Sequence, residues 1–201
     1  MRYSMSPYQK NILDIVQTSD NPAIGNIGGL VIWAKKVPFE VMQKCFALMI
    51  EKQPSLRLQL CQDYTWKLVP PQDSPLVYYD FTDKSEKEVR EFAQNQFQKG
   101  FHLLNQPLYE FAYLEMDQKC MVFAKIHHLI NDGASMVSMQ HWLEVFSSGQ
   151  VAGEIMVDNT YLNHLENQDF VSDRVYKMGI EKYTPVILQK DFPWKTHHAA
   201  A

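Results

Sequence analysis

Residues 108–133 read LYEFAYLEMDQKCMVFAKIHHLINDG and predict a β-hairpin followed by a turn into a helix. Two mainly apolar runs, 108–116 and 120–128, flank the short polar segment 117–119, which is typical of two strands joined by a tight connection. A helix is predicted over 134–146, because apolar side chains recur there at helical spacing. The adjacent histidines at 127 and 128 therefore stand where a strand ends and a helix is about to begin.

Helical and strand patterns alternate along the rest of the chain. Ser6 and Gln9 form a capping box for a helix whose buried stripe we expect at Ile12, Ile15 and Val16. The remaining predicted elements are helices after Pro38, after Ser85 and over 159–188, and strands over 30–33, 56–60, 65–69 and 76–81. This order predicts an α/β fold, a two-layer sandwich in which helices pack on a mixed β-sheet.

Composition excludes several classes of protein. The chain has 201 residues, 46% hydrophobic and 21% charged, which is the balance of an ordinary globular protein. The net charge of -4 argues against nucleic acid as a partner, because no basic excess is available for phosphates. No run approaches the length of a membrane span and no apolar leader opens the sequence, so we expect no membrane partner. The widely spaced Cys45, Cys61 and Cys120 favour a reducing, cytoplasmic setting.

The histidine pair is the strongest indication of chemistry. Neighbouring side chains on a strand point to opposite faces, so His127 and His128 cannot hold one metal ion together, and we expect no metal site. One imidazole can instead face a cavity while the other is held inside the fold. A neutral imidazole at a strand end is a good candidate for a general base, because imidazole titrates near working pH.

The residues after the pair suit a fixed loop. Asp132 can hold the loop by pairing with a cation, and Gly133 permits a backbone angle or a close approach that a side chain would block. The same pattern is equally compatible with two half-buried histidines beside an ordinary Asp-Gly turn, since such turns are common. The residues alone leave both interpretations open.

Residues 127–133, HHLINDG, match the pattern HHxxxDG, which resembles the signature of condensation domains of nonribosomal peptide synthetases. The same signature occurs in their acyltransferase relatives, which include chloramphenicol acetyltransferase. Three further landmarks follow the family's order: residues 6–9 (SPYQ) resemble its opening segment, 53–57 (QPSLR) its second motif, and 100–108 (GFHLLNQPL) the segment before the hairpin. The resemblance covers only the first of two lobes, since the family's domain is about twice as long.

The resemblance implies that residues 1–190 form the N-terminal, chloramphenicol acetyltransferase-like lobe, with 191–201 as a tail that is either a frayed end or an expression scar. Such a domain forms an amide bond between a carrier-bound donor thioester and an acceptor amine. It implies no directly bound cofactor, because the substrates ride on the phosphopantetheine arms of carrier proteins. The implied partners are the C-terminal lobe and a peptidyl or acyl carrier protein. We expect the lobe alone to be inactive, because half of its tunnel is absent.

The resemblance also implies a role for each motif residue. His128 would face the tunnel as the functional histidine, and His127 would be its inward-facing partner. Gly133 would keep the passage open beside the next helix. Asp132 would be structural and held by a cation, for which Arg57 is the candidate and the missing lobe the alternative source.

Two other functions stay open. The chain could be a stand-alone or dimeric acyltransferase that uses coenzyme A or a carrier and acylates oxygen or nitrogen, with a homodimer formed through exposed lobe surface completing the site. It could also be a non-catalytic module that binds a carrier protein. The acceptor that reacts, and complex formation without turnover, distinguish these functions.

Overall fold

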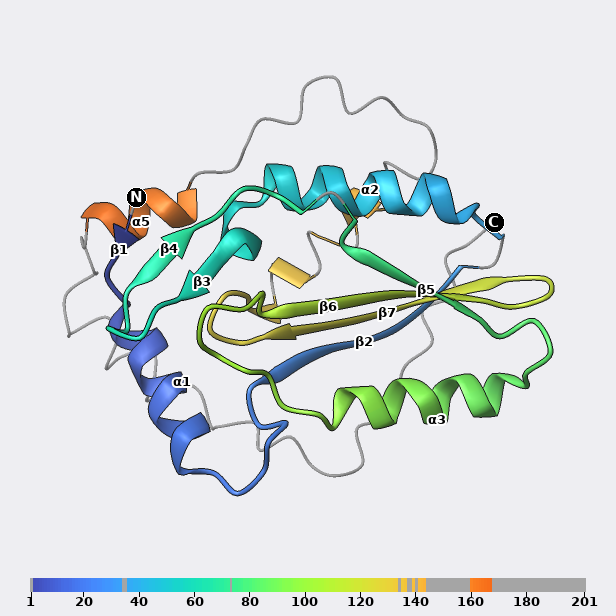
Figure 1. Ribbon diagram of the computed structural model, residues 1–201, viewed down its shortest axis with the longest axis horizontal. Coiled ribbons are helices and arrows are strands. Elements are labelled where there is room, and N and C mark those ends of the chain that lie inside the picture. Colours follow the sequence, from blue (N-terminus) through green and yellow to red (C-terminus); the bar gives the residue numbers. More distant parts are fainter. Residues whose placement is uncertain are drawn as a thin grey trace.

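The computed structural model describes residues 2–33, 36–72, 74–133, 135–136, 139, 141–143 and 160–167. Its centre is a four-stranded sheet in the order β2-β7-β6-β5, in which β7 lies between β2 and β6 (Figure 1). The strands are β2 (Asn26–Trp33), β5 (Leu76–Asp80), β6 (Tyr109–Glu115) and β7 (Cys120–His127). Only β5 and β6 pair in parallel, so the sheet is mixed, as the sequence predicts.

A second, antiparallel sheet has the order β1-β4-β3, with β1 (Arg2–Tyr3), β3 (Leu58–Leu60) and β4 (Trp66–Leu68). The 3-10 helix η1 (Pro54–Arg57) leads directly into β3. The strand predicted over 56–60 is therefore wrong in its first half. Pro54 has no N–H to give to a sheet and its ring fixes a helix-compatible backbone, so the chain makes one helical turn before it pairs.

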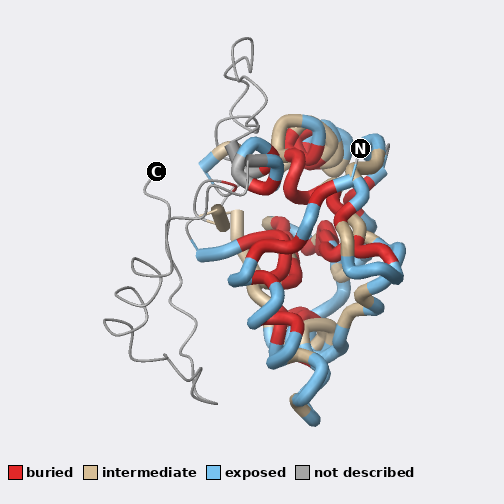
Figure 2. The backbone as a smooth tube through the Cα atoms, turned by 90° about the vertical axis from the view of Figure 1, so that its left-hand side faces the viewer, coloured by how far each residue is buried: buried red, intermediate tan, exposed pale blue. Residues whose placement is uncertain are grey.

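Helices cover both faces of the central sheet. α2 (Phe39–Lys52) lies along one face and α3 (Glu86–Phe97) along the other (Figure 1). On β6, Phe111 packs into the core beneath α2 and Leu114 into the core beneath α3. The predicted α/β class, with helices packed on a mixed sheet, is confirmed. Both faces of β6 and β7 are apolar, and each is covered by a helix. Figure 2 shows buried segments toward the middle of the described part of the chain and exposed segments toward its outside.

In the first helix the predicted N-terminal cap is confirmed, but the predicted buried stripe is partly wrong. In α1 (Pro7–Thr18), Ser6 and Gln9 make both hydrogen bonds of the predicted capping box. Ile15 is 55% exposed, whereas Leu13 is buried, so the stripe predicted at Ile15 is wrong. The buried face follows positions 9, 12, 13 and half-buried 16, which is a regular helical stripe that leaves position 15 outside.

Other local predictions are confirmed. The apolar positions of α2 are all buried, the box of Ser85 and Glu88 caps α3, and β6 and β7 form the predicted hairpin. β2 begins at Asn26, four residues before the predicted start, and it includes Gly28 at a φ of +132°. A Cβ there would lie 2.0 Å from the carbonyl oxygen of Ala124, so only glycine lets β2 and β7 approach this closely.

The helices predicted over 134–146 and 159–188 lie only partly within the described residues. Residues 133, 135–136, 139 and 141–143 are helical, in agreement with the helix predicted over 134–146. The predicted tail helix begins as α5 (Thr160–Asn167), and its remainder lies outside the described residues, as does the boundary at 190. None of the helices in the described ranges combines the length and apolar character that crossing a bilayer requires.

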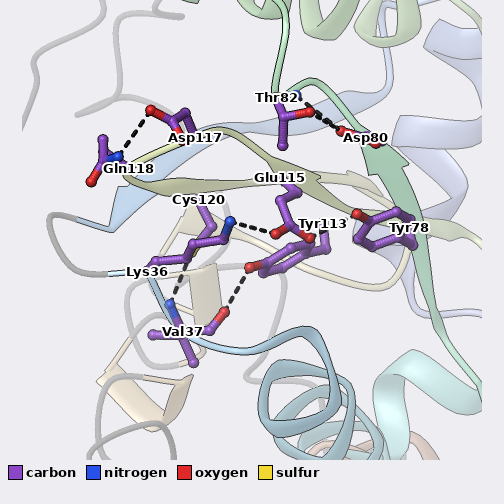
Figure 3. Close-up of polar contacts among 10 residues, drawn as sticks. All are labelled: Lys36, Val37, Tyr78, Asp80, Thr82, Tyr113, Glu115, Asp117, Gln118 and Cys120. Atoms are coloured by element: carbon purple, nitrogen blue, oxygen red, sulfur yellow. Dashed lines mark hydrogen bonds and ion pairs between the residues drawn. The ribbon is translucent and has the colours of Figure 1, made fainter.

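A polar cluster ties the hairpin to the segment before α2 (Figure 3). Lys36 forms an ion pair with Glu115, and the Glu115 carboxylate accepts a hydrogen bond of 2.7 Å from the Tyr78 hydroxyl. The Tyr113 hydroxyl donates to the carbonyl oxygen of Val37 at 2.6 Å. This hairpin-end cluster lies at the opposite end of β6 and β7 from the histidine pair.

Candidate active site

The two histidines lie at the end of a central strand. His127 is the last residue of β7, and His128 is the first residue of the turn that follows. Backbone hydrogen bonds fix both positions: the His127 N–H donates to the Leu108 carbonyl and the His128 N–H to the Gly25 carbonyl, each at 2.8 Å. The turn closes where the N–H of Ile130 donates to the His127 carbonyl at 3.1 Å.

His127 is enclosed by the fold. Its residue exposure is 2%, and the edge of its ring contacts Phe101 at a centroid distance of 5.8 Å. Nδ1 accepts a hydrogen bond of 3.1 Å from the N–H of Leu129, so the neutral ring carries its hydrogen on Nε2. Burial, and to a smaller extent the neighbouring His128, lower the pKa of His127 to about 4. His127 is therefore an uncharged ring that faces inward, as the family resemblance implies.

His128 has the opposite hydrogen-bonding pattern. Its Nδ1 lies 3.0 Å from the carbonyl oxygen of Asn131. Because a carbonyl oxygen can only accept, Nδ1 carries the hydrogen and the neutral ring keeps its lone pair on Nε2. The ring is only partly buried and meets Tyr8 edge to face, with centroids 6.0 Å apart. Adjacent histidines are thus held in opposite tautomers by two backbone groups of the same turn.

A cavity of about 220 Å³ opens beside His128. Its walls come from the start of α1, from the segment before and within η1, from the histidine turn and from α5; the lining residues are Ser6, Tyr8, Gln9, Gln53, Ser55, His128, Leu129, Ile130, Asn131, Asp132, Ser135 and Leu165. Tyr8, Gln53 and Ser55 were not predicted to belong to the site. The sequence signal that could have found them is that residues 6–9 and 53–57 both resemble landmarks of the same family. Nothing in the local pattern of either segment places it beside His128.

Gln9 joins three elements at the back of this cavity. Its Nε2 donates to the carbonyl oxygen of Leu129 at 2.8 Å, directly beside His128. Its Oε1 accepts hydrogen bonds from the indole N–H of Trp66 at 3.1 Å and from the backbone N–H of Ser6 at 2.9 Å. The buried amide that caps α1 therefore also holds the histidine turn.

Asp132 caps the helix that follows the turn. Its Oδ1 accepts from the N–H of Ser135 at 2.8 Å, which is the hydrogen bond of an N-cap residue. Arg57 lies in η1 and its Nη1 donates to the carbonyl oxygen of Val69 at 3.4 Å. The pairing of Arg57 with Asp132 stays a prediction.

Gly133 is the first helical residue after the turn. A Cβ added to Gly133 would meet no described atom within 4 Å, and its φ lies outside the left-handed region. The described part of this chain therefore does not itself require glycine at this position. Within the same described residues, no three histidine, cysteine or acidic side chains gather in a way that could hold a metal ion.

Comparison with known proteins agrees with this arrangement. The condensation domain family matches residues 1–174. The chain therefore belongs to the condensation domain family, as its HHxxxDG motif predicts, and it is the N-terminal portion of a domain of the nonribosomal peptide synthetase type.

The chain is similar to parts of longer proteins. A plipastatin synthase polypeptide of Bacillus subtilis (strain 168) is 23% identical over 189 residues, which cover 87% of this chain and 7% of that protein. The starter condensation domain of the rhizomide synthetase superposes with a TM-score of 0.71 at 20% identity, over 89% of this chain and 44% of that chain. The first condensation domain of the calcium-dependent antibiotic synthetase gives 0.66 at 16% identity, over 90% and 47%. The chain thus spans under half the length of these relatives.

Proposed function

We propose that this chain supplies the histidine half of a peptide-bond-forming active site, with His128 as the catalytic residue. In this reaction the nitrogen of an acceptor amine attacks the carbonyl carbon of a donor thioester. The C–N bond forms, the C–S bond breaks, and the proton lost by the amine leaves with the released thiol. An acceptor for that proton, placed in the cavity where the amine sits, lowers the barrier.

The observation that carries the proposal is the hydrogen bond from His128 Nδ1 to the Asn131 carbonyl. It fixes the tautomer with the lone pair on Nε2 in a residue that lines the cavity. His127 cannot serve this role, because its ring is buried and its Nδ1 is already engaged by the N–H of Leu129. Nε2 of His128 takes the proton from the amine or stabilises the charged intermediate.

The other motif residues support His128 without touching the reacting atoms. His127 braces the turn from inside, and Asp132 holds the next helix, with Arg57 or the second lobe as its cation. Gly133 leaves space for a substrate arm, which is consistent with the open volume around its Cα. The substrates arrive on phosphopantetheine arms, so the site needs no resident cofactor of its own.

The partners of this chain are the second half of the domain and a carrier protein, and the reaction takes place in the cytoplasm. The chain covers 44–47% of the solved domains named above, so the opposite wall of the cavity has to come from elsewhere. An open wall admits water and weakens the electrostatic stabilisation of the intermediate. The chain alone should therefore turn over little or not at all.

The test is amide formation by the full chain, alone and mixed with the C-terminal half of a condensation domain. The donor is an acyl pantetheine thioester, and amine and alcohol acceptors are compared. We expect the amide only in the mixture, with His128→Ala lowering its rate by about 10²- to 10⁴-fold. His102→Ala, which removes an exposed histidine, is the matched control and should leave the rate unchanged.

Four results would point elsewhere. Full transfer by the His128→Ala chain would remove His128 from the chemistry. Preferential acylation of the alcohol would favour an ester-forming relative, and tight binding of a carrier protein without product would indicate a docking module. Activity of the chain alone, together with a dimer in light scattering, would show that a second copy completes the site.

A further inference from the structure

A buried charge lies behind the histidine pair. Lys125 is on β7, two residues before His127, and none of its side chain is exposed. Alternation along the strand turns both side chains toward the α3 face of the sheet. A buried ammonium is stable only where its hydrogens find partners, so the groups around Lys125 show what it holds in place.

The partners of Lys125 lie mainly at the C-terminal end of α3. Its Nζ donates to the carbonyl oxygens of Gln96 at 3.3 Å and Lys99 at 3.2 Å, and pairs with Glu110 Oε2 at 2.8 Å. Carbonyl groups at the end of a helix lack partners within the helix, and the helix dipole favours a cation there. Lys125 therefore fastens the end of α3 to the strand that carries the histidines.

A second side chain fastens the same end to β2. Asn26 Nδ2 donates to the carbonyl oxygens of Phe97 at 2.7 Å and Lys99 at 2.9 Å, and Asn26 is the register partner of His127 across the two strands. The residue before it, Gly25, lies against the Nε2 end of the imidazole: an added Cβ would lie 2.2 Å from Nε2 of His127. The position of the Nε2 end of the ring is thus limited by the residue that leads into β2.

Phe101 connects Lys125 to the ring directly. The Lys125 ammonium lies 4.5 Å from the centroid of Phe101, within range of a cation–π contact. Phe101 in turn meets the ring of His127 at an interplanar angle of 82°. His127 is therefore held between Gly25 and Phe101, and both are tied to the end of α3 that Lys125 and Asn26 cap.

We propose that Lys125 is a positioning residue for the histidine pair: its ammonium holds the end of α3 and Phe101 against His127, and so sets the turn that presents His128. Only the consequence at His128 rests on the proposed function; the placement of the His127 ring does not. A methionine at position 125 would match the length of the lysine side chain and its apolar stem. It would leave the carbonyl groups of Gln96 and Lys99 and the carboxylate of Glu110 without their cation.

The test follows the His127 imidazole by long-range proton–nitrogen NMR in the full chain, with the signals assigned from His127→Gln and His128→Gln. Besides Lys125, the titratable groups described around His127 are His128 and, on β6, Glu110. In the wild type we expect a neutral ring protonated on Nε2 that titrates near pH 4. In Lys125→Met the ring should become hydrated and its pKa should rise by about one unit or more.

Two further variants separate positioning from charge and from stability. Phe101→Leu removes the connecting ring without changing any charge, and it should raise the pKa of His127 in the same direction. Val89→Ala is the matched control, because Val89 is fully buried in α3 but lies far along the helix from the capped end. It should lower stability and leave the His127 signals in place.

The outcomes are decisive in each case. If Lys125→Met folds and His127 titrates as in the wild type, the inference is overturned. If Lys125→Met does not fold, an unchanged His127 in Phe101→Leu overturns it instead. Neither result bears on the proposed function, which is tested by amide formation with the His128→Ala variant. Full transfer by that variant would contradict the proposed function and would leave the positioning of His127 by Lys125 unaffected.

Discussion

The two ends of the central sheet use similar polar contacts under different conditions. At the hairpin end, Lys36 and Glu115 form their ion pair with 35% and 23% of their side chains exposed (Figure 3). At the histidine end, the Lys125 side chain is fully buried although Glu110, its ion-pair partner, is 49% exposed, and Gln9, which is 2% exposed, makes its hydrogen bonds in the interior. Water can replace a lost partner of Lys36 or Glu115 at the hairpin end, but it does not reach the Lys125 ammonium or the Gln9 amide at the histidine end.

This difference indicates where the loss of a contact lowers the stability of the fold most. A buried donor or acceptor that loses its partner costs about 1–3 kcal/mol, whereas an exposed ion pair contributes about 0–1 kcal/mol. The hydrogen bonds of Lys125 to the carbonyl groups at the end of α3 and those of Gln9 are of the first kind, and the Lys36–Glu115 pair of the hairpin-end cluster is of the second. The contacts that are most costly to lose are therefore concentrated around the candidate active site.

The largest effect should follow Gly25→Ala, because the new methyl group would overlap the buried ring of His127. We expect a loss of about 3 kcal/mol or more in the free energy of unfolding, measured by urea denaturation. Gly133→Ala is the matched control, since a Cβ there meets no described atom within 4 Å, and it should change stability by less than about 0.5 kcal/mol. Equal losses in both variants would show that the contact with His127 is not what requires glycine.

The next effect should follow Gln9→Leu, which keeps the side chain buried but removes its amide. The indole N–H of Trp66 and the carbonyl oxygen of Leu129 would then lose partners in the interior. We expect a loss of about 2 kcal/mol in urea denaturation and a weaker hold on the histidine turn. A change below about 0.5 kcal/mol would mean that water reaches these groups and that this end is less enclosed than the distances indicate.

A pH effect of similar size should come from His127. Its pKa falls from 6.5 to about 4 on folding, so the unfolded chain binds a proton that the folded chain rejects at intermediate pH. Stability from this group is present above pH 6.5 and is lost as pH falls toward 4. Between about pH 7.5 and 5 the wild type should lose about 2 kcal/mol more than His127→Gln. Parallel stability curves for the two chains would contradict a buried neutral His127.

Local pattern predicted much of this molecule from its sequence. Periodicity gave the hairpin of β6 and β7 and the buried face of α2, and spacing gave both capping boxes. Alternation along a strand also predicted that one histidine faces inward while its neighbour faces a cavity. These features depend on residues within one or two turns of each other, so the pattern contains the information.

The contacts that enclose the site could not be predicted in this way. Gln9 and Leu129 are 120 positions apart, and Gly25 meets His127 only because β2 pairs with β7. Nothing near Lys125 in the sequence indicates that the end of α3 will cover its side chain. Such contacts are set by packing between elements, which local propensity does not encode.

The smallest effect should follow Lys36→Met at the hairpin end. The ion pair with Glu115 is partly exposed, so its removal should change the free energy of unfolding by about 0.5 kcal/mol, and by less at high salt, where the attraction is screened. The Tyr78 phenol gives a second measurement, because its hydrogen bond to Glu115 raises the pKa of Tyr78 to about 12. In Glu115→Gln a spectroscopic titration should find that pKa shifted back toward 10. A loss above about 1.5 kcal/mol in Lys36→Met would mean that this end is as enclosed as the histidine end. The cost of losing a contact would then be similar at both ends of the sheet, and this cost would not distinguish the candidate active site.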